Sequence, residues 1–225
     1  SFIMFDVRTL IIFMIAAAFI LLIEMIVLAR IFPQQRYLKI WILAYFILIL
    51  SLIGFALRGL VSDFISIVVA NSLIIVVFYC EIWASEILIK RYRYRFWQFS
   101  AGLILYAILF FYWSDVSPNF PIRVILSSTV IGALSFSFGW IMWRRGGLKY
   151  RNCKWIGALM MTNAVLVCTR MVSLIDAPVF VSIMAPSNLA IYSLWRSILV
   201  AVLFGFFVIL LALEIDAKET DRSGG

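Results

Sequence analysis

Four polar side chains lie within or beside long apolar segments, where a polar group needs a particular partner. A charge at membrane depth is costly, and it marks an ion pair, a binding site or a transport route. The planar guanidinium of arginine holds a carboxylate or phosphate through two parallel hydrogen bonds. Arginines from three segments at one depth therefore predict a pocket, walled by Leu, Ile and Phe, for an anionic and partly apolar ligand such as a lipid-like acid. The predicted ligand-binding residues are Arg58, Asn71, Arg170 and Arg196.

Two further roles for these arginines stay open at this point. Each guanidinium can extend to the outer headgroups or pair with a nearby acid. The candidate acids are Asp63, Asp115 and Asp176. The arginines can also lie at an oligomer contact. A spacing of seven residues places Asn163 and Arg170 on one helix stripe, which favours a shared polar surface.

Three acidic residues, Glu24, Glu81 and Glu86, lie in the opposite half of the apolar segments from the arginines. Ion pairs with the basic connections are the simplest role for them. A cation or proton route is the competing role. Glu81 and Glu86 are five residues apart, about 140° around a helix, so they do not line one face.

The elements that must position these residues are helices of a membrane protein. The chain of 225 residues is 65% hydrophobic and 13% charged, whereas a soluble domain is about half apolar and a quarter charged. Seven apolar segments joined by short polar connections predict an all-α bundle of seven transmembrane helices. The expected segments are Leu10–Ala29, Ile40–Leu57, Phe64–Ile89, Phe96–Trp113, Val124–Trp143, Trp155–Ile175 and Leu189–Leu213.

The basic residues predict the orientation of the bundle. Fourteen of the 19 Lys and Arg residues fall in the first, third and fifth connections and in the C-terminal tail. Because cytoplasmic loops collect Lys and Arg, the N-terminus is expected outside and the C-terminus in the cytoplasm. The same bias accounts for the net charge of +8, so no nucleic-acid partner is expected. Trp41 and Trp155 are expected to anchor spans at the cytoplasmic interface. The outer connections 114–121 and 176–188 are expected to be long enough to cap a cavity.

Several kinds of chemistry lack the residues that they need. The chain has no His, which removes the usual haem and zinc ligands, so no metal site and no cofactor are expected. No Ser or Cys inside the bilayer has an evident base, and the seventh segment has no Lys for a retinal Schiff base, so no catalytic residue is predicted. Cys153 is expected in a cytoplasmic loop and Cys80 and Cys168 inside spans, which argues against a disulfide framework.

The last apolar segment and the tail predict a mechanical link. Leu189–Leu213 is long enough to cross a bilayer at about 1.5 Å per residue. The tail, 214–225, favours a helix and has no Pro or Gly before its last two residues. We therefore expect a membrane sensor domain, 1–213, followed by the start of a cytoplasmic signalling helix. Glu214 lies eighteen residues after Arg196 on the same helix stripe and is predicted to take part in signal transmission.

A spaced set of residues resembles one bacterial family. Trp41 precedes the Leu-Arg-Gly-Leu sequence at 57–60, and Ser-Ile-Val-Val-Ala-Asn follows at 66–71. Arg170, the Ala-Pro-Ser sequence at 185–187 and a Leu-rich last segment continue the pattern. The pattern resembles the N-terminal membrane sensor regions, called MASE-type, of bacterial diguanylate cyclases with GGDEF domains.

The resemblance implies a role, partners and a location. It implies a membrane signal-input domain that regulates a cytoplasmic output domain, commonly one that makes cyclic di-GMP, as a homodimer in the bacterial inner membrane. The chain has no GGDEF signature, so the enzymatic activity is not expected in this polypeptide. A small seven-helix transporter is the alternative, because Pro33-Gln34 near a span end is similar to PQ-loop carriers. The internal repeats and mid-span breaks of transporters are missing.

Overall fold

The computed structural model describes residues 7–90, 96–172 and 188–223, and these residues are almost entirely helical. Long apolar runs form helices because a helix satisfies every backbone hydrogen bond within the segment itself. Three short stretches are π-helical and continue a neighbouring α-helix. The elements are α1 (Val7–Ile31), α2 (Arg36–Ala56), η1 (Phe64–Val69), α3 (Ala70–Leu88), α4 (Phe96–Phe111), η2 (Tyr112–Val116), α5 (Phe120–Ile141), η3 (Met142–Gly146), α6 (Gly147–Lys149), α7 (Arg151–Val172) and α8 (Asn188–Ser223).

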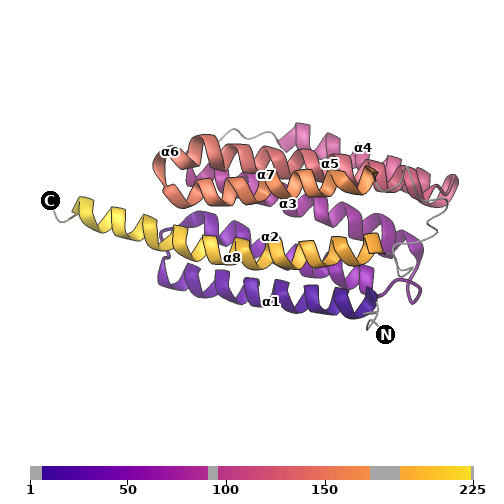
Figure 1. The fold of residues 1–225 in the computed structure, drawn as a ribbon, viewed down its shortest axis with the longest axis horizontal. Helices are drawn as coiled ribbons and strands as arrows, with labels where there is room; N and C mark the ends of the chain where they lie inside the picture. The colour runs from indigo at the N-terminus through magenta and orange to yellow at the C-terminus, as the bar shows by residue number, and fades with distance from the viewer. Residues whose placement is uncertain (1–6, 91–95, 173–187, 224–225) are drawn as a thin grey trace.

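The long helices form one elongated bundle, with α8 extending beyond its neighbours at the end where the chain leaves it (Figure 1). We call this the C-terminal end of the bundle. The main neighbours are α5 with α7, α2 with α3, and α1 with α2, while α8 packs against both α1 and α7. Helix α8 therefore contacts the first and the last of the other long helices.

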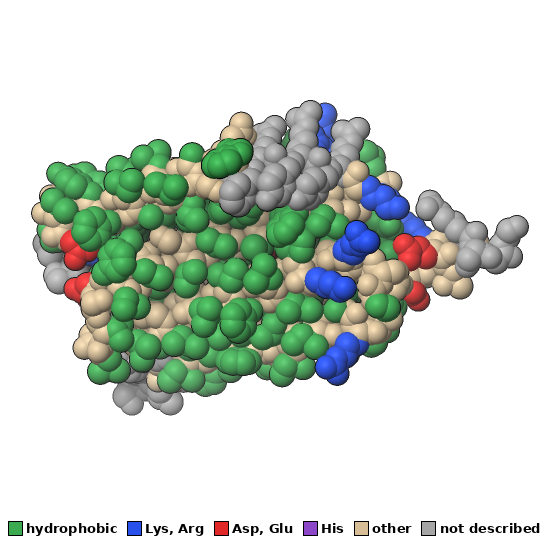
Figure 2. Space-filling model, turned by 180° about the vertical axis from the view of Figure 1, so that it is seen from behind, with side chains coloured by type: hydrophobic (Ala, Val, Ile, Leu, Met, Phe, Trp, Pro, Cys, Tyr) green, Lys and Arg blue, Asp and Glu red, His purple; other side chains and the backbone are tan. Residues whose placement is uncertain are grey.

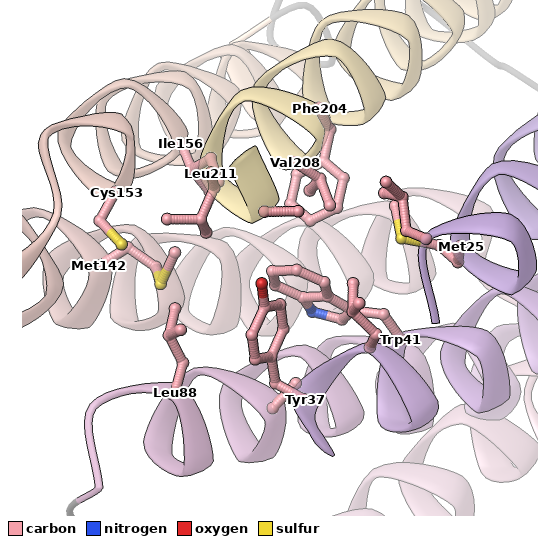
Figure 3. Packing of buried hydrophobic residues seen from close by; sticks show 14 of the residues in the cluster. Met25, Tyr37, Trp41, Leu88, Met142, Cys153, Ile156, Phe204, Val208 and Leu211 are labelled. Carbon is pink, nitrogen blue, oxygen red and sulfur yellow. The ribbon is translucent and has the colours of Figure 1, made fainter. Parts of the chain in front are cut away.

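The half of the bundle near the C-terminal end holds the main apolar core. Trp41 is fully buried there and meets the Phe204 ring edge-on, with ring centroids 5.5 Å apart. Figure 3 shows Tyr37, Met25 and residues of α8 pointing toward this pair. The expectation that Trp41 anchors a membrane interface is wrong, because its ring packs inward between α2 and α8 instead of outward.

Helices α5 and α7 approach closely through two glycines. A Cβ built on Gly157 would lie 2.7 Å from the Gly139 carbonyl oxygen and 2.6 Å from the Trp143 backbone nitrogen. Small residues let membrane helices pack backbone against backbone. The contact fixes α7, and with it the side chains that α7 contributes to the interior.

Six of the helical stretches that the structure describes are long and apolar enough to cross a membrane, as expected for a multi-pass membrane protein. Figure 2 shows a face that is mostly hydrophobic, with Lys and Arg side chains gathered at the C-terminal end. Helix α7 is not among the six; the expected segment Trp155–Ile175 continues past Val172, where the described part of α7 ends.

Two sequence predictions about connections are wrong. Helical structure continues through η2 to Val116, and Asn119 caps α5 by accepting a hydrogen bond from the Ile122 backbone N–H at 3.1 Å. The connection is therefore too short to cap a cavity. The other expected cap, 176–188, lies outside the described residues up to Ser187. Cys153 does not lie in a loop, because α7 already begins at Arg151 and its first turn buries Cys153 completely.

Candidate functional site

The bundle contains a partly open cavity of about 270 Å³, mainly in the half opposite the C-terminal end. Its walls come from the first half of α1, the second half of α2, η1, α3, the end of α4, α5, α7 and the first half of α8. Tyr45, Met160 and Phe204 separate it from the apolar core. Ligand sites of this kind measure about 300–1,000 Å³, so the cavity suits a small ligand.

All four predicted ligand-binding residues line this cavity: Arg58, Asn71, Arg170 and Arg196. They come from four different elements. Arg58 lies in the turn after α2, where Gly59 adopts a positive φ of 84°, a conformation that glycine accepts without strain. Asn71 is in the first turn of α3, Arg170 in the last turn of α7, and Arg196 two turns into α8.

A fifth polar residue of the cavity, Arg123, was not predicted from the sequence. The apolar segment was expected to begin at Val124, which left Arg123 in a connection. The Asn119 cap instead starts α5 at Phe120, so Arg123 belongs to the first turn and reaches the cavity. The signal was available in the sequence, because Asn followed by Pro two residues later is a typical helix start.

Several arginine nitrogens in the cavity are buried without a hydrogen-bond partner in the described part of the chain. They are Nε of Arg123, Nε of Arg170, and Nε and Nη1 of Arg196. Arg196 Nη2 donates one long hydrogen bond, 3.4 Å, to Ser197 Oγ. A buried guanidinium without an acceptor is costly, which makes these groups candidates for holding an anion.

Nearby acids can offset the charge of only some of the arginines that line the cavity. Asp63 lies within electrostatic range of both Arg58 and Arg123. Burial and the nearby Arg123 lower the pKa of Arg58, while Asp63 opposes them. Arg170 and Arg196 form no salt bridge with any acid among the described residues. Asp176, a candidate partner at the sequence level, lies outside the described residues.

The two asparagines of the cavity are already partly committed to the protein. Asn71 Nδ2 donates to the Ile67 carbonyl oxygen at 2.6 Å. Asn163, which shares a stripe with Arg170 as expected, donates from Nδ2 to Ser135 Oγ at 3.1 Å. Each Nδ2 keeps a second N–H that these contacts do not use, because an amide nitrogen carries two hydrogens.

Two of the three acids, Glu24 and Glu81, do not follow the ion-pair prediction. Glu81 Oε2 and Glu24 Oε1 are buried with no hydrogen-bond partner within the described ranges. Glu81 lines the cavity, whereas Glu24 packs against Gly205, where an added Cβ would lie 2.7 Å from Glu24 Oε2. Glu81 is buried and lines the cavity, so it points into the bundle instead of toward the basic connections.

Glu214, predicted to transmit a signal, binds the start of a neighbouring helix. Its carboxylate accepts hydrogen bonds from the backbone N–H groups of Arg151 at 2.7 Å and Asn152 at 2.9 Å. Lys218 donates to the same carboxylate at 3.0 Å and to the Lys149 carbonyl oxygen at 2.7 Å. The first N–H groups of a helix have no partner within it, so α8 supplies the cap of α7.

Comparisons with protein-family models, curated proteins and solved structures give no match for this chain. The resemblance to membrane sensor regions of diguanylate cyclases therefore stays a prediction. A functional assignment must rest on the cavity, its arginines and the contacts of α8.

Proposed function

We propose that this chain is a signal-input domain that binds an anionic, lipid-like ligand in the cavity and transmits its presence through α8. The observation that carries the proposal is the convergence of Arg170 and Arg196 on one cavity with buried nitrogens that lack partners among the described residues. The ligand would carry a carboxylate or phosphate at the arginine end and an apolar chain among the surrounding Leu, Ile and Phe side chains.

The electrostatics of the cavity favour such a ligand. Arg170 lies within electrostatic range of Arg196, so two like charges face each other in a medium of low dielectric constant. An anion between them offsets both the mutual repulsion and the loss of hydration. Each guanidinium–carboxylate contact contributes about 1.5–3 kcal/mol.

Helix α8 connects the cavity to the C-terminal end. Arg196 lines the cavity and Glu214 holds α7, and the two residues lie eighteen positions apart on one uninterrupted helix. At a rise of 1.5 Å per residue the separation is about 27 Å. If α8 can take two placements in the bundle, a ligand that binds the protein more tightly in one of them increases the population of that placement. The contacts of Glu214 would then change together with the contacts of Arg196.

The complete proposal has seven spans, with the N-terminus outside and the C-terminal end in the cytoplasm. Helix α7 packs between α5 and α8, so its polar residues can face the interior while its apolar residues face lipid. The basic C-terminal end supports this orientation. In this proposal the protein belongs to a bacterial inner membrane, acts as a homodimer and regulates a cytoplasmic output domain such as a diguanylate cyclase.

The test is native mass spectrometry of the purified chain, with extraction and identification of bound lipids. We expect a discrete anionic amphiphile that is lost in Arg170→Ala and Arg196→Ala. The matched control is Arg145→Ala, which removes an exposed arginine far from the cavity and should keep the ligand. An unchanged ligand content in the cavity variants would overturn the proposal. Substrate uptake by liposomes containing the protein would favour the transporter alternative.

A further inference from the structure

Glu81 is an acidic group that the proposed anion site does not use. Its side chain lines the cavity, and the residue is only 7% exposed. Its Oε2 is buried and accepts no hydrogen bond from any described residue. A buried carboxylate without a donor is among the most costly arrangements in a protein interior.

The position of Glu81 is at the far end of the cavity from the arginines. On α3, Glu81 follows Asn71 by ten residues, which corresponds to about 15 Å along the helix. Asn71 lines the same cavity as the four arginines, and each arginine belongs to the end of its element that lies away from the C-terminal end. The cavity is thus positive at one end and acidic at the other.

In the described part of the chain, no side chain or backbone group donates a hydrogen bond to Glu81 Oε2. Tyr45, a polar residue of the same cavity wall, lies within electrostatic range of both Glu81 and Glu24. No hydrogen bond links Tyr45 to Glu81 Oε2 in the described structure. A second carboxylate nearby makes this end still more favourable for a hydrogen-bond donor or a positive charge.

We infer that the ligand has two polar ends: an acid held by the arginines and, about 15 Å away, a hydrogen-bond donor held by Glu81. The donor is a hydroxyl or an ammonium group, because both present the hydrogen that a carboxylate oxygen accepts. A plain fatty acid would leave Glu81 without a partner. The inference rests on the proposed function, since it concerns the same cavity and specifies the class of its ligand.

Glu24 provides a matched control. It is also a glutamate in the same half of the bundle with a buried oxygen that lacks a partner among the described residues. Unlike Glu81, it does not line the cavity and packs against Gly205. A nonspecific effect of removing a buried charge would appear in both variants, whereas loss of ligand recognition should appear only at Glu81.

The experiment compares four saturated ligands of equal chain length by titration calorimetry of the chain in zwitterionic nanodiscs. They are dodecanoic acid, ω-hydroxydodecanoic acid, ω-aminododecanoic acid and dodecanedioic acid. We expect the wild-type protein to bind at least one of the two donor-bearing acids about tenfold or more tightly than dodecanoic acid, and the diacid least tightly. If only ω-aminododecanoic acid binds more tightly, the group that Glu81 recognises is an ammonium. If ω-hydroxydodecanoic acid binds more tightly, Glu81 accepts a neutral donor.

The variants then assign the preference to one residue. Glu81→Gln should reduce it by about fivefold or more while retaining the affinity for dodecanoic acid, and Glu24→Gln should keep it. Equal binding of dodecanoic acid and both donor-bearing acids by the wild-type protein would overturn the inference, and this comparison needs no variant. A preference that survives in Glu81→Gln would overturn it too.

The proposed function fails in a different way. If none of the acids binds, or if Arg170→Ala and Arg196→Ala bind them as well as the wild-type protein does, both proposals are overturned. If dodecanoic acid binds in an arginine-dependent manner without any preference for a terminal donor, only the role of Glu81 is overturned.

Discussion

Glu214 of α8 holds Asn152 of α7 by two hydrogen bonds to one oxygen, from the backbone N–H at 2.9 Å and from the side-chain amide at 3.0 Å. The two residues are 62 positions apart in the chain. Asn152 Nδ2 also donates to the Leu210 carbonyl oxygen at 3.2 Å, one turn earlier on α8. Three hydrogen bonds therefore tie the start of α7 to this part of α8.

Replacing Glu214 by Ala should loosen the first turn of α7. We expect a loss of about 0.5–2 kcal/mol in the local stability of this turn, because two backbone N–H groups lose their acceptor. Hydrogen–deuterium exchange should show faster exchange at residues 151–154. Asp216→Ala is the control, because Asp216 faces about 200° around α8 from Glu214. Equal exchange in both variants would show that Glu214 does not cap α7.

Replacing Gly157 by Ala should destabilise the contact between α5 and α7. The new methyl group would lie 2.6 Å from the Trp143 backbone nitrogen, so the helices must separate. We expect a loss of about 1–3 kcal/mol, measured by unfolding of the protein in mixed detergent micelles. Gly102→Ala on α4 is the control, because nothing lies within 4 Å of its added Cβ. That variant should be neutral or more stable by up to about 1 kcal/mol.

Replacing Trp41 should separate the effect of its volume from the effect of its indole N–H. The side chain is fully buried, and Nε1 has no hydrogen-bond partner within the described ranges. Trp41→Ala should cost about 3–5 kcal/mol of stability because it leaves a cavity beside Phe204. Trp41→Phe should cost much less, since no hydrogen bond is lost. Trp97→Ala, at a side chain that is 83% exposed, should change stability little. Similar losses in the Ala and Phe variants would contradict this packing.

The thiol of Cys153 should remain protonated in the folded protein at physiological pH. It precedes the apolar part of α7, and burial, followed by the nearby Glu214 carboxylate, raises its pKa from 9.0 to about 12. Lys149 and Lys218 oppose this shift in part. A maleimide reagent at pH 8 should therefore modify Cys153 only after denaturation.

The same shift predicts a pH dependence of stability. Below pH 9.0 the thiol is protonated in both the folded and the unfolded states, so its contribution does not change. Between this pH and about 12, only the unfolded state ionises, and the folded protein should lose up to about 1.4 kcal/mol per pH unit. Cys153→Ala should remove this component of the alkaline slope. An identical slope in the variant would contradict it.

Local properties of the sequence were sufficient to predict the helices and most of the candidate site. Apolar runs of membrane-spanning length favour helices, so each expected segment begins within about four residues of the start of a described helix. The ends differ more, since helical structure continues past Trp143 to Lys149 and the end of the segment Trp155–Ile175 lies outside the described residues. Arg58, Asn71, Arg170 and Arg196 could be selected because a polar group in an apolar run is a local property. Glu214 and Arg196 could also be placed on one helix, since no Pro lies between them.

Which of these residues meet, and what each one faces, depends on the folded bundle. Glu24 and Glu81 look equivalent in the sequence, yet Glu81 lines the cavity and Glu24 packs on Gly205. Trp41 was expected at an interface and lies in the core. The physical reason is that burial and pairing depend on the rotation of each helix against its neighbours. That rotation is set by contacts between residues far apart in the chain, such as Gly139 with Gly157, which no local pattern reveals.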